Sequence, residues 1–372
     1  MQPKIAIVCD WLTSRGGAER VIYVLHGMFP NAPIYTSIFD ENLTEFADAA
    51  IITSYLQNIP FAAQNHRFLL PFMPHIFETF DFSDFDIVIS SCHSCAKGII
   101  TKPNTTHICY CHSPMRYAWD NAPEYIKEYE MSSILKKIGG KFLHKIRIWD
   151  KLAAARPDYY IANSRYIKDK IKKFYKRDSE VIHPSVDMDK FYISGAQKNY
   201  YLAIGRLTPY KKFSLLVDVF NDLGYPLKII GTGVEYAKLK GRANKNIEFL
   251  GRVEEDKLAH LYAEARALVF PQIEDFGIAP LEAMASGTPV IAYKAGGVLE
   301  TITPETGLFF EEQNALMLEA ALYRFEKTHK IFNPQKIRKH AEKFSIENFV
   351  GKFGKFIEKT LEPHATHPVT MV

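Results

Sequence analysis

The chain has 372 residues, of which 47% are hydrophobic, 24% are charged and 13% are aromatic, and its formal net charge is +4. This length is more than one hydrophobic core usually organises, so we expect two domains. The small net charge gives no argument for nucleic acid as a partner, and no apolar run reaches the ~20 residues that a membrane-spanning helix needs.

The first apolar run and the cysteines predict a cytoplasmic protein. The run over residues 4–9 ends at Asp10, which makes it too short for a signal peptide and typical of a buried strand. Five cysteines are an odd number that fits no closed disulfide framework. Two closely spaced cysteine pairs also fit a zinc site. Burial is the simpler interpretation, because Cys109 and Cys111 share one face of an expected strand, and we expect no bound metal.

Short apolar runs alternate with longer amphipathic stretches, which is the pattern of parallel sheets covered by helices on both faces. We expect strands at residues 4–9, 86–90, 106–111, 158–162, 180–183, 200–204, 227–230, 247–250, 267–270, 290–293 and 308–310. A polar, linker-like stretch at 194–199 separates two doubly wound halves. We therefore predict an N-terminal domain over 1–190, a C-terminal domain over 191–345, and a terminal helix over 346–362 that can pack back on the N-terminal domain.

Gly16 and Gly17 lie between the first expected strand and the helical residues 21–25. In doubly wound folds, glycines at this position admit a phosphate. The alternative is that the pair serves only the turn.

His112 follows the expected strand at 106–111. Open α/β sheets bind ligands at the carboxyl ends of their strands, so this histidine is a candidate functional residue. The alternative is a structural histidine whose hydrogen bonds are satisfied within the fold.

Residues 134–151 contain six Lys or Arg against one Asp, interleaved with apolar residues. Such a segment can lie on an anionic membrane surface, with its apolar face in the interface and its cations near the headgroups. The alternative is a surface helix that packs its apolar face into the core. Gly139 and Gly140 are expected to weaken any continuous helix here.

Arg206 and Lys211 lie on the loop that leaves the strand at 200–204. Two cations at this edge can neutralise a diphosphate leaving group without a metal ion, Arg as a bidentate fork and Lys as a point charge. The Asp-x-Asp pairs of the chain lie before a strand and in the linker, where a metal-dependent sugar transferase would not use them.

The stretch over residues 271–289 is the strongest candidate for the chemistry. It begins where the strand at 267–270 ends, and a helix of about two turns is expected to follow. Free amides at its N-terminus suit a diphosphate, and Gly277 lets a ligand approach the backbone closely. The side chain of Glu282 tilts back toward that N-terminus and can reach a ribose hydroxyl. Glu274, on the loop, would face the group at the other end of the diphosphate, so the stretch predicts a nucleotide-sugar site.

Together these residues resemble the retaining glycosyltransferases of family 4. That family has the GT-B fold, an α/β architecture of two facing Rossmann-like, doubly wound domains with an interdomain cleft. The resemblance covers nearly the whole chain, and its motifs are Gly16-Gly-Ala-Glu-Arg20, Cys111-His-Ser-Pro-Met-Arg-Tyr-Ala-Trp-Asp120, Ala162-Asn-Ser164, His183-Pro-Ser-Val-Asp187, Gly205-Arg-Leu-x3-Lys211 and Glu274-x7-Glu282.

The resemblance implies roles for the C-terminal residues. Glu282 would hold the nucleoside ribose, Arg206 and Lys211 the diphosphate, and Glu274 the hydroxyls of the donor sugar. Backbone amides would come from Phe276, Gly277 and Ile278. The chain departs from the family pattern at Lys212, where glycine usually follows the lysine.

The resemblance also implies roles for the N-terminal domain, which would bind the acceptor. His112 would sit beside the transferred sugar, and Gly16 and Gly17 would let their loop close over the phosphates. Family members work without a metal or other cofactor and retain the anomeric configuration. The leaving diphosphate accepts or relays the proton.

The motifs beginning at Cys111 and His183 are similar to those of bacterial mannosyltransferases that build lipopolysaccharide or exopolysaccharide from GDP-mannose. We therefore expect transfer of a hexose, mannose in the first place, to an oligosaccharide or lipid-linked acceptor. This would occur in the cytoplasm or peripherally on the inner face of the plasma membrane. The alternatives are a transferase that uses a UDP-sugar, a GT-B sugar-nucleotide epimerase, and a non-catalytic carbohydrate-binding GT-B protein.

Overall fold

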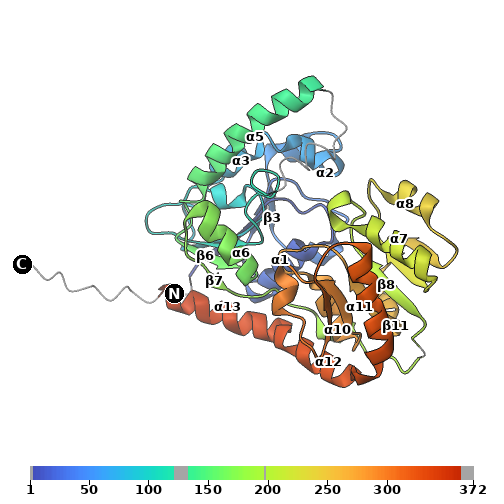
Figure 1. The fold of residues 1–372 in the computed structure, drawn as a ribbon. Coiled ribbons are helices and arrows are strands. Elements are labelled where there is room, and N and C mark those ends of the chain that lie inside the picture. Colours follow the sequence, from blue (N-terminus) through green and yellow to red (C-terminus); the bar gives the residue numbers. More distant parts are fainter. Residues whose placement is uncertain (1–2, 121–132, 197, 362–372) are drawn as a thin grey trace, which may run out of the picture.

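The structure, a computed structural model, describes residues 3–120, 133–196 and 198–361. Figure 1 shows two α/β halves, each built around its own sheet. No helix in these described ranges is long and apolar enough to cross a membrane.

The N-terminal sheet has seven parallel strands in the order β3-β2-β1-β4-β5-β6-β7. Its strands are β1 (Ile5–Cys9), β2 (Ile34–Thr36), β3 (Ile51–Thr53), β4 (Ile87–Cys92), β5 (Thr106–Cys111), β6 (Tyr159–Ala162) and β7 (Glu180–Val181). β2 and β3 were not predicted, because three-residue runs are too short for a recognisable pattern. The last strand is also shorter than expected.

Side chains of β1 alternate between two cores. Ala6 and Val8 belong to the cluster on one face of the sheet, and Ile7 and Cys9 belong to the cluster on the other. Both faces are therefore buried, which explains why the strand is apolar throughout. The helices of this half are α1 (Gly17–Met28), α2 (Ala62–Asn65), α3 (Met73–Thr79), α5 (Ser133–Ala153) and α6 (Arg165–Lys170).

Helix α5 corrects one expectation. It runs without interruption through Gly139 and Gly140, where we expected a weakened helix. Packing supplies the stabilisation that the glycines lack, because Leu143 and Ile146 are buried in the N-terminal core. The side chains of residues 133–139 and 141 lie outside what the structure describes.

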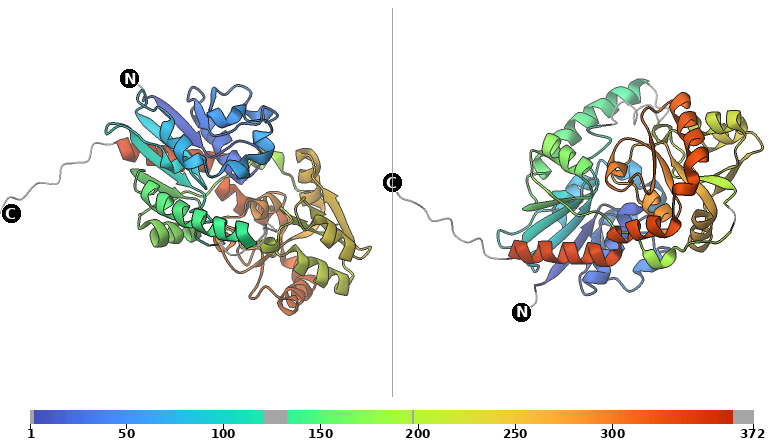
Figure 2. Two further views of the ribbon diagram at one scale, coloured as in Figure 1. Left: turned by 90° about the horizontal axis from the view of Figure 1, so that it is seen from above. Right: turned by 60° about the horizontal axis from the view of Figure 1, so that its bottom comes forward.

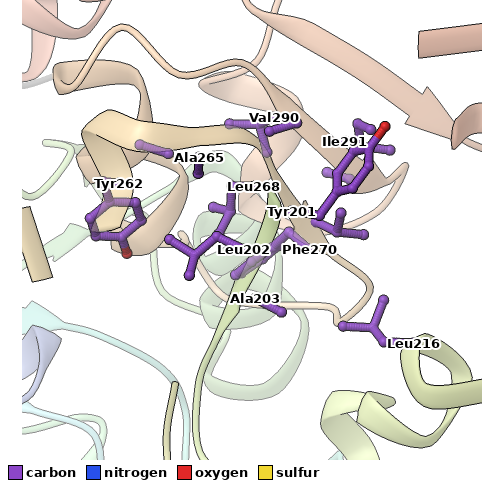
Figure 3. Packing of buried hydrophobic residues seen from close by; sticks show 14 of the residues in the cluster. Tyr201, Leu202, Ala203, Leu216, Tyr262, Ala265, Leu268, Phe270, Val290 and Ile291 are labelled. Atoms are coloured by element: carbon purple, nitrogen blue, oxygen red, sulfur yellow. The ribbon is translucent and has the colours of Figure 1, made fainter. Parts of the chain in front are cut away.

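The C-terminal sheet has six parallel strands in the order β10-β9-β8-β11-β12-β13. They are β8 (Tyr200–Ile204), β9 (Leu227–Ile230), β10 (Ile247–Gly251), β11 (Ala265–Phe270), β12 (Val290–Tyr293) and β13 (Gly307–Phe310). Figure 3 shows Leu202, Leu268 and Phe270 among the side chains packed around the central strands. The covering helices are α7 (Phe213–Leu223), α8 (Tyr236–Arg242), α9 (Glu255–Glu264), α10 (Ile278–Ala285), α11 (Ala315–Thr328) and α12 (Pro334–Ala341).

The last helix, α13 (Ile346–Leu361), leaves the C-terminal half and lies along the N-terminal sheet (Figure 2, right). Phe349 and Phe353 are buried in the same cluster as Ile7 and Tyr110. The two rings contact Tyr110 with centroid distances of 5.9 and 6.3 Å. The chain therefore crosses between the two halves twice.

Each sheet has one point at which the strand order reverses. In the N-terminal sheet it lies between β1 and β4, and in the C-terminal sheet between β8 and β11. Loops that leave neighbouring strands on either side of such a point diverge and form a crevice, where open α/β sheets bind ligands. The loops after these four strands contribute to a common cleft between the two halves.

Candidate active site

The interdomain cleft has a volume of about 1080 Å³ and is lined by both halves of the chain. The loops after β1, β4 and β5 form its N-terminal wall, and those after β8 and β11 form its C-terminal wall. All the predicted site residues line it: Gly16, Gly17, His112, Arg206, Lys211, Glu274, Phe276, Gly277, Ile278 and Glu282.

Glu274 lies between two cations from different domains. Its Oε1 is 2.6 Å from Nζ of Lys211, and its Oε2 is 3.3 Å from the guanidinium of Arg116. Burial raises the pKa of Glu274, but Lys211 and Arg116 outweigh burial and lower the pKa to about 2. The carboxylate is therefore charged at any working pH, and it can accept hydrogen bonds from sugar hydroxyls.

Asp275 ties the same loop to the N-terminal domain. Its carboxylate accepts a hydrogen bond of 2.8 Å from Arg116, and its backbone carbonyl accepts one of 2.5 Å from Ser164. Lys170 is 3.5 Å from its second oxygen. Arg116 and Asp275 belong to two of the stretches that the sequence analysis singled out. Nothing in the sequence pattern predicted the contact between them. Arg116 thus binds both carboxylates and aligns the β11 loop with the cleft.

Helix α10 begins after Gly277, which has φ 93° and ψ 81°. This left-handed conformation favours glycine, and it turns the chain sharply from the β11 loop into the helix. The backbone amides of Phe276, Gly277 and Ile278 donate no hydrogen bond to any residue that the structure describes. They are therefore available to an anionic ligand in the cleft. The side chain of Phe276 is buried against His183, with ring centroids 5.4 Å apart.

Glu282 lies one turn into α10, and its side chain reaches the cleft. Tyr262 donates a hydrogen bond of 2.7 Å to its Oε2, and Arg20 of helix α1 pairs with its Oε1. The carboxylate is almost wholly buried. A ribose that binds this carboxylate must therefore share it with Tyr262 or replace Arg20.

Arg206 and Lys211 occupy the loop after β8, as the spacing predicts. Lys211 is held by Glu274, whereas the exposed Arg206 forms no ion pair with another described residue. Lys212 has φ 58°, so a lysine occupies a left-handed position that usually requires glycine. The departure from the family pattern therefore strains this loop but leaves both cations at the cleft.

His112 lies at the end of β5 with its Nε2 2.8 Å from Oγ of Ser91. Burial, with a further contribution from His93, lowers the pKa of His112 to about 3. The ring is therefore neutral at physiological pH. Asn163 donates a hydrogen bond of 3.0 Å to the backbone carbonyl of His112, which fixes the residue at the cleft wall.

Gly16 and Gly17 form the N-terminus of α1, with Gly16 as the capping residue. A Cβ on Gly17 would come within 2.8 Å of Cδ1 of Ile278 on the opposite domain. A Cβ on Gly16 would come within 2.6 Å of Oε2 of Glu19. Gly17 therefore allows the α1 loop to approach the start of α10 closely, whereas Gly16 leaves room for the side chain of Glu19 in the same helix.

A buried Asp10 and a half-exposed His93 face each other at the reversal point of the N-terminal sheet. Their Oδ2 and Nδ1 atoms are 3.1 Å apart. Asp10 also accepts backbone hydrogen bonds of 2.6 to 2.9 Å from His93, Ser94, Cys95 and Ala96. The sequence did not predict this pair, because the two residues are 83 positions apart. The only available signal was that each follows a strand.

The cysteines and carboxylates provide no cluster typical of a metal site in the described ranges. All five cysteines are free and buried. No group of three or more His, Cys, Asp or Glu side chains among the described residues could hold a metal ion.

Two family models together match residues 15–344. Residues 15–190 match the model described as Glycosyltransferase Family 4, and residues 187–344 match the model described as Glycosyl transferases group 1. The boundary between the two models falls at the seam between the two halves of the structure.

Two curated relatives illustrate the sequence similarity. An uncharacterised glycosyltransferase of Methanocaldococcus jannaschii is 32% identical over 229 residues, which are 58% of this chain and 63% of that protein. The O-antigen chain mannosyltransferase RfbU of Salmonella typhimurium is 35% identical over 176 residues, which are 44% of this chain and 48% of that protein. In both comparisons the chain covers less than two thirds of the relative's length.

Among solved structures, a sucrose-phosphate synthase of Thermosynechococcus elongatus superposes with a TM-score of 0.74 at 18% identity. The superposition covers 96% of this chain and 99% of that one. This likeness and the two family models confirm the predicted fold class, in which two Rossmann-like domains face each other. The chain belongs to glycosyltransferase family 4 and has the GT-B fold.

Proposed function

We propose that the protein transfers mannose from GDP-mannose to a saccharide acceptor, with retention of the anomeric configuration. The observation that carries the proposal is the position of Glu274, held by Lys211 and Arg116 where the strand order of the C-terminal sheet reverses. A charged acceptor group at this point suits the hydroxyls of a donor sugar. Mannose is the proposed sugar because of the motifs beginning at Cys111 and His183, and because the relative RfbU is named a mannosyltransferase.

The donor's diphosphate would bind between the amides that precede α10 and the cations of the β8 loop. As the glycosidic bond to the sugar breaks, negative charge grows on this diphosphate. Arg206, Lys211 and the N-terminus of α10 line the cleft, and in this proposal their positive charge stabilises the diphosphate in the transition state. We therefore propose that no metal cofactor is needed.

The acceptor would enter from the N-terminal wall, where His93 and His112 meet the cleft. Asp10 holds His93 through Nδ1, so Nε2 of His93 can accept a hydrogen bond from an acceptor hydroxyl. His112 is neutral and can donate or accept a hydrogen bond without repelling a cationic sugar centre. The hydroxyl would attack on the face that the diphosphate leaves, and its proton would pass to the diphosphate.

We further propose that the acceptor is lipid-linked and that the protein works at the inner face of the plasma membrane. Helix α5 supports this proposal, because its sequence carries six Lys or Arg and its apolar residues Ile148 and Leu152 are exposed. Exposed apolar groups beside cations suit an anionic bilayer surface.

The test is to incubate the purified protein with GDP-mannose, UDP-glucose or ADP-glucose, with and without saccharide acceptors, and to analyse the products. Transfer from GDP-mannose with an α-linkage, identified by NMR, would support the proposal. Turnover with UDP-glucose alone would correct the donor. An epimerised sugar released without acceptor would indicate an epimerase, and nucleotide binding without turnover would indicate a non-catalytic protein. EDTA should leave the rate unchanged, whereas inhibition that Mn²⁺ reverses would refute metal independence.

A further inference from the structure

One stretch of the N-terminal domain exposes an unusual number of large apolar side chains. It spans residues 52–72 and includes η2 (Tyr55–Asn58), helix α2 and η3 (His66–Leu69), and α2 contacts both of the other short helices. The exposed large hydrophobic residues of this 52–72 surface are Ile52, Tyr55, Ile59, Phe61, Phe68 and Phe72. Phe61 and Phe68 are each about three quarters exposed, at 75% and 73%. Soluble proteins rarely group such side chains in solvent without a binding partner.

The backbone at Phe61 is strained, and the ring of this residue is exposed to solvent. Phe61 has φ 59° and ψ 26°, the left-handed conformation that non-glycine residues adopt at a cost of roughly 1–2 kcal/mol. Its carbonyl accepts a hydrogen bond of 3.1 Å from the amide of Asn65, so helix α2 begins directly from the strained residue. Strain of this kind in a residue with an exposed aromatic ring points to a function outside the fold.

The 52–72 surface carries no carboxylate, and the cations that would attract an anionic partner belong to the sequence of helix α5. No Asp or Glu occurs from residue 49 to residue 77, so the segment brings no negative charge to an interface. Helix α3 follows the segment directly and is joined to the basic helix α5, because Trp149 donates a hydrogen bond of 2.9 Å to Glu78. Figure 1 shows α2, α3 and α5 on the same side of the N-terminal domain.

The 52–72 surface is also continuous with the cleft. Ala63, Gln64, His66 and Leu70 come from the same segment and line the N-terminal wall. The rings of His66 and Trp11 lie 5.0 Å apart at the centroids, which joins the segment to the loop after β1. A partner bound at the exposed aromatics would therefore lie at the mouth of the acceptor side of the cleft.

We propose that the 52–72 surface docks the protein on an anionic lipid bilayer, with the rings of Phe61, Phe68 and Phe72 in the interfacial region. Aromatic rings are favoured at the boundary between headgroups and acyl chains, and the cations of α5 add electrostatic attraction to anionic lipids. In this orientation the acceptor side of the cleft opens at the bilayer surface. This inference rests on the proposed transfer to a lipid-linked acceptor. Vesicle binding is measured without turnover, so the docking surface and the transferase activity can each be refuted separately.

The test is co-sedimentation of the full chain with vesicles of phosphatidylethanolamine and phosphatidylglycerol. The triple variant Phe61→Ser, Phe68→Ser, Phe72→Ser should bind at least tenfold more weakly than the wild type. The matched control replaces three exposed apolar residues of the C-terminal domain, Val234→Ser, Leu316→Ser and Ile331→Ser, and should bind like the wild type. Equal binding by both triple variants and the wild type would overturn the proposal.

Two further measurements keep the proposal falsifiable. The single variant Phe61→Trp should show an emission shift to shorter wavelength when vesicles are added, and no shift would contradict insertion at this position. Gel filtration without lipid should show the same oligomeric state for the wild type and the triple variant. If the wild type is a dimer and the triple variant a monomer, the surface binds a second copy instead of a bilayer.

Discussion

Arg20 of helix α1 forms an ion pair with Glu282 of helix α10, which joins the two domains across the cleft. Glu282 is almost wholly buried, and its other oxygen accepts the hydrogen bond from Tyr262. The resemblance to family 4 assigns this carboxylate to the ribose of the donor. If Glu282 binds the ribose, as this resemblance implies, nucleotide binding and the interdomain contact compete for the same carboxylate.

Arg20→Gln should tighten GDP binding about tenfold, because the ribose would no longer compete with a charge-assisted hydrogen bond worth roughly 1.5–3 kcal/mol. Isothermal titration calorimetry measures the effect. Arg266→Gln is the control, since Arg266 pairs with Glu326 away from the cleft lining and its loss should leave GDP affinity unchanged. Weaker GDP binding by Arg20→Gln would mean that Arg20 itself contacts the nucleotide.

Glu274→Ala should lower the transfer rate at least about 100-fold and leave GDP binding nearly intact, because its proposed contact is with the sugar and not the nucleotide. Steady-state kinetics and calorimetry separate the two effects.

The pKa of Glu274 is lowered to about 2 from an ordinary value near 4.5, so its ionised form contributes stability above pH 4.5. That contribution is lost as the pH falls from 4.5 through 2. The pH profile of wild-type turnover should therefore show no step from Glu274 between pH 5 and 9. Unchanged turnover in Glu274→Ala would refute the role assigned to this residue.

The buried histidines should make the fold sensitive to acid. Burial lowers the pKa of both His107 and His112 to about 3, from an ordinary value of 6.5. Below pH 6.5 the unfolded chain binds protons that the folded chain excludes, so the free energy of unfolding should fall as the pH drops from 6.5 toward 3. Urea unfolding at several pH values checks this.

The double variant His107→Gln, His112→Gln should flatten that pH dependence. Replacing His260 by Gln is the control and should leave the pH dependence as steep as in the wild type, because the side chain of His260 lies at the surface. If the double variant keeps the wild-type slope, the acid sensitivity arises from other groups.

Lys212→Gly should stabilise the protein by up to about 1 kcal/mol, because glycine removes the steric cost of the left-handed conformation at φ 58°. Thermal and urea unfolding measure the gain. Lys176→Gly is a matched comparison, since Lys176 has φ 59° outside the cleft lining and should give a similar gain. A loss of stability in Lys212→Gly would show that the lysine side chain makes a stabilising contact in this loop.

Much of the architecture could be read from local pattern. Strands such as β5, β8, β9 and β12 have the bounds that the sequence predicts, because a strand buried on both faces is mostly apolar. The helix after Gly277 was predicted from Pro280 and Gly287, whose backbone preferences act within a few residues. Spacing along the chain likewise placed Glu282 on α10 and Lys211 on the loop after β8.

Partners distant in the chain could not be read in this way. Arg116 with Asp275, Asp10 with His93, and Arg20 with Glu282 are separated by 159, 83 and 262 positions. Local backbone and side-chain preferences do not predict such contacts, because these depend on strand order and on how the two sheets face each other.

The sequence therefore specified which side chains stand at strand ends and helix starts, through propensities that act over a few residues. Only the packed fold decided that Glu274 lies between Lys211 and Arg116. Bringing cations from two domains to one buried carboxylate requires the burial of both cores, and that burial is a property of the whole chain.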